Sequence, residues 1–164
     1  MNDSGLVRVA AGTEGKVWTD SLAGCTSTAG VARLADGSSV AYVSHFDPMV
    51  DRFQRTGGTS SPSERAIYSF TGMAAAHSPV VAARIVVAYD QSNVHNPDYG
   101  NRSKPYDEWY FLDQLEVAGE QLGKRDNLEV VFVPYPSGTG ESLGVDVSPN
   151  AEAIYFNGQA VTQL

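Results

Sequence analysis

The chain has 164 residues, 42% of them hydrophobic and 18% charged, with 11 Lys and Arg against 19 Asp and Glu, a net charge of −8. These values predict a single domain spanning residues 1–164 and exclude a largely disordered chain. The negative charge argues against nucleic acids and anionic membranes as partners. A single cysteine, Cys25, excludes an internal disulfide framework and a cysteine-rich zinc site.

The first residues, 1–5, carry neither a basic segment nor an apolar segment of the kind found in a signal peptide. No apolar run reaches the roughly 18 residues that a membrane-spanning helix needs. We therefore expect a cytoplasmic protein with no membrane segment. Delivery of the protein into another cell as an effector stays open.

Short β-forming segments occupy the first third of the chain. The patterns predict strands at residues 6–10, 17–19, 25–34 and 39–45. Between the last two, Ala35-Asp36-Gly37 is a strong hairpin signal. Clusters of Pro, Gly and Ser then predict a loop over residues 46–61.

The rest of the chain alternates helices and strands. A helix is expected from Ser63-Glu64 to Pro79, and a second from Pro105 to Gly123. The continuous apolar run 80–89 predicts a strand covered on both faces, and residues 90–104 predict a long polar loop. Further strands are predicted at residues 128–133, 143–147, 153–156 and 160–162, with an Asn157-Gly158 turn before the last. This order predicts an α+β protein: a layered α/β sandwich with a mixed or antiparallel sheet and about two helices.

The loop length of the first hairpin decides whether Cys25 and His45 can meet. A two-residue loop would place His45 opposite Thr28, and the side chain of Cys25 would point to the other face of the sheet. A three-residue loop, with Gly37 in the left-handed conformation, places His45 opposite Ser27. Cys25 is then a diagonal neighbour of His45 on the same face, with Cα atoms roughly 7–8 Å apart. We predict the three-residue loop.

A cysteine beside a histidine suits nucleophilic catalysis. The histidine takes the proton of the thiol and later delivers one to the leaving group, and a third group fixes the orientation of the imidazole. Gly24 lets the backbone approach a substrate carbonyl, and the N–H of Cys25 is a candidate oxyanion donor. Taken alone, these residues also allow a buried structural cysteine and a structural histidine.

The run Leu22-Ala23-Gly24-Cys25, with Thr19 six residues before the cysteine and His45 on the next strand, resembles a known motif. It is similar to the signature of the glutamine deamidases that share the fold of CheD, the chemoreceptor deamidase, and of the cytotoxic necrotising factors. The toxins have Ser where this chain has Ala23. The element order is also similar over most of the chain.

The resemblance implies a CheD-like fold and a Cys25–His45–Thr19 triad that deamidates a glutamine side chain through a thioester, without a cofactor. It further implies that the partner is a protein substrate bearing the target glutamine. The thioester can pass to water or to an amine, so transglutamination stays open. Two other interpretations stay open: a non-catalytic interaction module on the same scaffold, and another cysteine hydrolase that works by acyl transfer.

A metal site is the remaining candidate that the sequence offers. His77, Asp90, His95 and Asp98 are the residues considered for it, but their spacing matches no ligand pattern. We therefore expect a solvated polar loop here and no metal.

Overall fold

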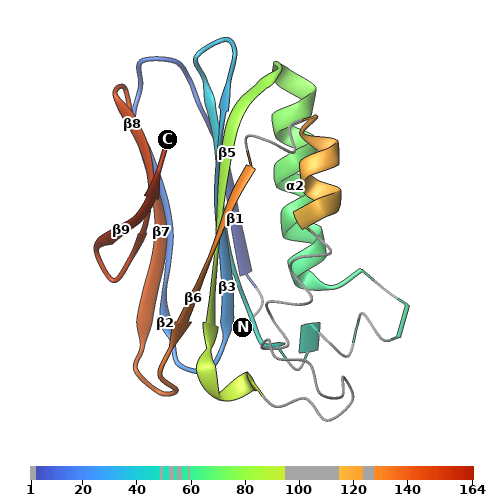
Figure 1. Cartoon of the computed structure of the whole chain (residues 1–164), viewed down its shortest axis with the longest axis vertical. Helices are drawn as coiled ribbons and strands as arrows, with labels where there is room; N and C mark the ends of the chain where they lie inside the picture. Colours follow the sequence, from blue (N-terminus) through green and yellow to red (C-terminus); the bar gives the residue numbers. More distant parts are fainter. Residues whose placement is uncertain are drawn as a thin grey trace.

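The computed structural model describes residues 3–48, 50–51, 54, 57–58, 60–94, 115–123 and 128–164 of the chain. The elements form three layers, with helices on one side, a five-stranded sheet in the middle and a four-stranded sheet on the other side (Figure 1). This mixed α/β arrangement of mainly antiparallel strands agrees with the expected α+β class. None of the described helices is long and apolar enough to cross a membrane.

The strands of the described residues are β1 (Asp3–Val9), β2 (Gly15–Leu22), β3 (Thr26–Leu34), β4 (Ser39–Phe46), β5 (Val80–Asp90), β6 (Leu128–Tyr135), β7 (Glu141–Ser148), β8 (Ala151–Phe156) and β9 (Gln159–Gln163). The five-stranded sheet has the order β1-β4-β3-β5-β6, and the four-stranded sheet the order β2-β7-β8-β9. Only the β5–β6 pair is parallel within these sheets. The predicted strands are therefore present, although β2 is much longer than the three residues expected.

Helix α2 (Pro62–His77) begins close to the predicted start. Ser61 caps its N-terminus and Glu64 completes a capping box, so two backbone N–H groups of the first turn are satisfied by side chains. Proline at the first helical position fits because its missing N–H has no partner to lose there. The apolar side of α2 packs on the central sheet.

The prediction of a loop over residues 46–61 is wrong for part of that range. Pro48, Val50, Asp51 and Gln54 are helical, and the N–H of Asp51 donates to the carbonyl of Asp47. Proline is well suited to the first turn of a helix, so its presence did not mark a loop here.

The second predicted helix is described only in its last part. Residues 115–121 are helical and lie beside α2 (Figure 1). The helix ends at Gly123, whose φ of +65° is the left-handed conformation expected of a C-terminal glycine. The start expected at Pro105 lies outside the described residues. In the polar segment 90–104, η1 (Gln91–Val94) is a short 3₁₀ helix, and residues 95–104 lie outside the described range.

The β3–β4 hairpin has the predicted three-residue loop. The N–H of Leu34 donates to the carbonyl of Ser38, and Gly37 has a φ of +81°. His45 consequently pairs with Ser27. The register on which the Cys25–His45 argument depended is confirmed.

Alternate residues of β3 and β4 serve two apolar cores. Even-numbered residues such as Leu34 and Tyr42 pack toward the helices, and odd-numbered ones such as Val31 and Val43 pack toward the second sheet. At Gly30 a Cβ would lie 2.4 Å from the ring of Tyr42, so glycine here makes room for that ring. The face toward the second sheet is also the face on which His45 lies.

Candidate functional site

Cys25 lies where the chain passes from one sheet to the other. Residues 23–25 connect β2 of the four-stranded sheet to β3 of the five-stranded sheet. The end of β2 is irregular, with a register shift between Thr19 and Leu22 and a left-handed Ser21 at φ 60°. Gly24 has a φ of +126°, which favours glycine over any residue with a Cβ. The glycine before the cysteine is therefore required by the backbone of this crossing.

Tyr135, the last residue of β6, hydrogen-bonds to the backbone of this crossing. Its hydroxyl donates to the carbonyl of Cys25 and accepts from the N–H of Gly24 at 3.3 Å. The side chain is buried, with 1% exposed, and its ring lies against Phe156. Because the Gly24 N–H is engaged in this way, the N–H of Cys25 is the better candidate for an oxyanion donor. Sequence reasoning missed Tyr135, since nothing local connects residues 110 positions apart.

His45 and Thr19 meet across the two sheets. His45 is on β4 and is buried, and Thr19 is on β2, with 3.1 Å between Thr19 Oγ1 and His45 Nδ1. When Nδ1 carries the proton and donates to Thr19, Nε2 keeps a lone pair. Nε2 is buried and has no hydrogen-bond partner among the described residues. The imidazole is thus held by one nitrogen, and the other is left for a reacting group.

Cys25 lies on the same face of the central sheet as His45. Its side chain packs against the apolar residues between the two sheets, which is the layer that His45 enters to reach Thr19. Since His45 Nε2 has no partner among the described residues, the thiol and the imidazole are not hydrogen-bonded in this structure. Catalytic hydrogen bonds are often long before substrate binds, so the missing bond does not exclude a catalytic pair.

Both groups are uncharged at neutral pH. Burial raises the pKa of the Cys25 thiol, and the nearby Asp47 carboxylate raises it further. Burial lowers the pKa of His45, against the opposing effect of the carboxylates of Asp20 and Asp3. The resting pair is therefore a thiol and a neutral imidazole, and the imidazole is in the form that accepts a proton.

Asp90 brings a carboxylate close to the crossing. It is 2% exposed, and its Oδ2 lies 3.6 Å from where a Cβ on Gly24 would stand. Burial opposes its ionisation, but hydrogen bonds from Ser137 and Ser92 outweigh burial and lower the pKa of Asp90. The carboxylate therefore lies, ionised, beside the backbone of Gly24 in this crossing.

The candidate metal ligands do not come together among the residues that can be compared. No group of three or more His, Cys, Asp or Glu side chains within the described ranges could hold a metal ion. His77 lies in the last turn of α2, and Asp90 is hydrogen-bonded to Ser92. His95 and Asp98 lie outside the described residues.

No model of a known protein family matches the chain, and no curated protein matches it. The site geometry and the motif around Cys25 are therefore the features that point to a function.

Proposed function

We propose that this protein is a cysteine amidohydrolase that deamidates glutamine side chains on a protein substrate. Cys25 is the nucleophile, His45 the general base and acid, and Thr19 the group that orients His45. The observation that carries the proposal is the Thr19–His45 contact across the two sheets, which leaves Nε2 unengaged on the face where Cys25 lies. A structural histidine would be expected to use both nitrogens when buried.

The first half of the reaction forms a thioester. As substrate binds, the Cys25 thiol gives its proton to His45 Nε2, and the thiolate attacks the side-chain carboxamide carbon. The N–H of Cys25 stabilises the oxyanion of the tetrahedral intermediate. The C–N bond then breaks, and the imidazolium of His45 returns the proton to the departing ammonia.

The second half releases the product. His45 takes a proton from water, the resulting hydroxide attacks the thioester, and the C–S bond breaks. The Cys25 thiolate recovers its proton from His45, and the glutamine has become glutamate. A primary amine in place of water would give transglutamination by the same steps.

Two further parts of the proposal concern fold and compartment. The helix layer, the mixed central sheet and the strand order with Cys25 and His45 on neighbouring segments support a CheD-like fold. A cysteine nucleophile is kept reduced in the cytosol, which supports work in the cytoplasm, either of the producing cell or of a cell that receives the protein.

The test is release of ammonia from glutaminyl peptides and proteins, with incorporation of ¹⁸O from labelled water into the product. The wild type is expected to release ammonia, and Cys25→Ser and His45→Ala are expected to release none while melting as the wild type does. Tyr68→Ala, which removes an exposed side chain on α2, is the matched control and keeps the activity. Adding a primary amine separates transglutamination from hydrolysis by the product mass.

A second reagent covers the case in which the right substrate is absent. A peptide with a chloromethyl ketone in place of the glutamine carboxamide should alkylate Cys25 in the wild type and react far more slowly in His45→Ala. Equal alkylation of both proteins, with no ammonia release, would favour a non-catalytic interaction module. Cleavage of peptide or ester bonds by the wild type would favour another cysteine hydrolase.

A further inference from the structure

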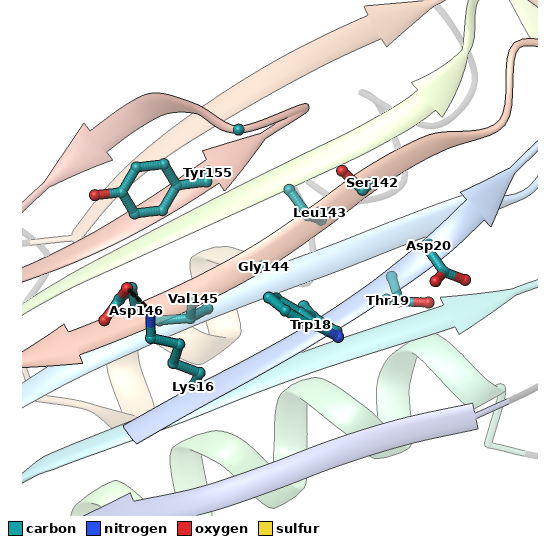
Figure 2. A pocket seen from close by; sticks show the side chains of 11 residues that line it. Lys16, Trp18, Thr19, Asp20, Ser142, Leu143, Gly144, Val145, Asp146 and Tyr155 are labelled. Atoms are coloured by element: carbon teal, nitrogen blue, oxygen red, sulfur yellow. Dashed lines mark ion pairs between the residues drawn. The ribbon is translucent and has the colours of Figure 1, made fainter. Parts of the chain in front are cut away.

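A groove of about 400 Å³ lies on the outer face of the four-stranded sheet. Trp18 on β2, Gly144 on β7 and Tyr155 on β8 form one row across its strands. Figure 2 shows Tyr155 with its ring broadside and Trp18 with its indole nearly edge-on, on either side of Gly144. Trp18 is 76% exposed, a rare state for a tryptophan in a folded protein.

The glycine in this row is required by the tryptophan. A Cβ at position 144 would lie 2.7 Å from the Cβ of Trp18, so any other residue would displace the indole. Without a side chain between the two rings, backbone forms the floor of the groove. The groove is therefore flanked by two aromatic side chains and is open to solvent.

The charged side chains that line the groove have a net negative charge. Its lining includes the carboxylates of Asp20 and Asp146 and the ammonium of Lys16. Lys16 Nζ is 2.8 Å from Asp146 Oδ2, so these two charges neutralise one another at one end of the groove. Asp20 lies at the other end, two residues from Trp18 on the same face of β2, about 7 Å along the strand.

We propose that this groove binds the cationic side chain, arginine or lysine, of a basic protein segment. An aromatic face attracts a cation, tryptophan most strongly, and a guanidinium stacked on Trp18 is within reach of the Asp20 carboxylate. The net charge of −8 attracts a basic partner over long range and opposes a second copy of this chain.

The position of the groove ties it to the candidate active site. Thr19 stands between Trp18 and Asp20, and its side chain reaches through to His45 on the opposite side of the strand. The groove therefore lies on one face of β2, and the candidate catalytic residues lie on the side of the other face. Resting on the proposed function, we infer that the basic segment belongs to the protein whose glutamine enters the Cys25 site.

Binding is tested without catalysis, on the Cys25→Ser protein. Calorimetry compares a peptide carrying two arginines with the same peptide carrying citrulline, which keeps the shape and loses the charge. The arginine peptide is expected to bind and to weaken with added salt, the citrulline peptide to bind far less, and Trp18→Ala to lower the affinity on the order of tenfold. Tyr68→Ala is the matched control, since it removes an exposed aromatic ring on α2 and keeps the affinity.

Several results would overturn the groove as a cation site. They are equal binding of both peptides, unchanged affinity in Trp18→Ala, absence of binding to either peptide, binding of a neutral oligosaccharide alone, or dimerisation that Trp18→Ala abolishes.

The link to catalysis has its own readout. With glutaminyl peptides, the wild type should show a lower KM for the arginine-flanked peptide than for the citrulline-flanked one, and Trp18→Ala should abolish this preference. Binding without any difference in KM would overturn the link and leave the cation site standing. Binding with no ammonia release from either peptide would count against the proposed deamidase and not against the groove.

Discussion

At the scale of single residues, the members of the proposed triad contribute unequally. Thr19 contacts His45 through a 3.1 Å hydrogen bond to Nδ1, and its side chain neither gains nor loses a proton in the proposed reaction. His45 by contrast moves a proton in every step. The two residues should therefore respond differently to truncation.

Thr19→Ala should lower the rate of ammonia release by less than His45→Ala does. A general base contributes about 10²–10⁴-fold, and a group that only orients the base should give the lower end of that range or less. The measurement is single-turnover ammonia release on one glutaminyl protein. If Thr19→Ala were folded and as inactive as Cys25→Ser, Thr19 would have a direct part in the chemistry.

The protonation state of Cys25 gives a second residue-scale prediction. Because burial raises the pKa of the thiol, alkylation by iodoacetamide should be slow at pH 7 and should rise about tenfold per pH unit to beyond the ordinary thiol pKa of about 8.5. His45→Ala should change the rate at pH 7 little, since no hydrogen bond joins the imidazole to the thiol at rest. A plateau in the rate below pH 7 would show a preformed thiolate and contradict this state.

At the scale of elements, β6 acts on the site through one hydroxyl. Tyr135→Phe removes both contacts to the Gly24–Cys25 backbone and keeps the ring packed against Phe156. We expect kcat to fall with KM little changed, because the nucleophile is displaced and the rest of the site stays. Loss of these buried hydrogen bonds should cost about 1–3 kcal/mol of unfolding free energy.

Tyr68→Phe is the matched control for that variant, since it removes an exposed tyrosine hydroxyl on α2. The kcat and the unfolding free energy should both be unchanged in Tyr68→Phe. A Tyr135→Phe protein with normal kcat would show that the hydroxyl stabilises the fold without positioning Cys25.

The β3–β4 hairpin sets the register of His45 and can be tested through Gly37. Gly37→Ala places a Cβ on a residue at φ +81° and 3.3 Å from Ala11, which should cost about 1–2 kcal/mol. Gly72→Ala in α2 is the opposite case, because the new methyl group meets no neighbour within 4 Å and the helix favours alanine by about 1 kcal/mol. Thermal melts should move down in the first variant and up in the second, and equal shifts would contradict the assignment.

At the scale of the whole molecule, the features that could be predicted from the sequence are those that depend on residues close together in the chain. The hairpin loop, the start of α2 and the Cys25–His45 face followed from turn residues and from alternation along neighbouring strands. The division of the strands between two sheets did not, since alternation shows which face is buried and not which strand lies opposite. The contacts of Tyr135 with residues 24–25 and the Trp18–Gly144–Tyr155 row depend on that long-range pairing. Thr19 was found only because the motif marked it.

An ion pair between Arg33 and Glu152 joins the two sheets, at the end of β3 that is farther from Cys25. Arg33 of β3 bonds the carboxylate of Glu152 of β8 through two nitrogens, and Ser39 of β4 donates to the same carboxylate at 2.8 Å. Burial of Glu152 opposes its ionisation, but these hydrogen bonds outweigh burial and lower the pKa of the carboxyl. Folding therefore stabilises the ionised form of the Glu152 carboxyl group relative to the unfolded chain.

Glu152→Gln should lower the unfolding free energy by about 2 kcal/mol at pH 7, since it leaves Arg33 against a neutral amide. A carboxyl with a lowered folded pKa contributes stability above its unfolded pKa, about 4.3, and loses it as pH falls through the folded value. The gap between wild type and variant should thus be constant from pH 7 to about pH 5 and shrink below that. Glu129→Gln is the control, because the Glu129 side chain is 54% exposed in its ion pair with the partly buried Arg84, and it should change stability by less than about 1 kcal/mol. Denaturant unfolding of the three proteins from pH 7 to pH 3 measures both effects, and a gap that widened on acidification would mean that Glu152 is protonated in the fold and that Arg33 does not bind it as a charge.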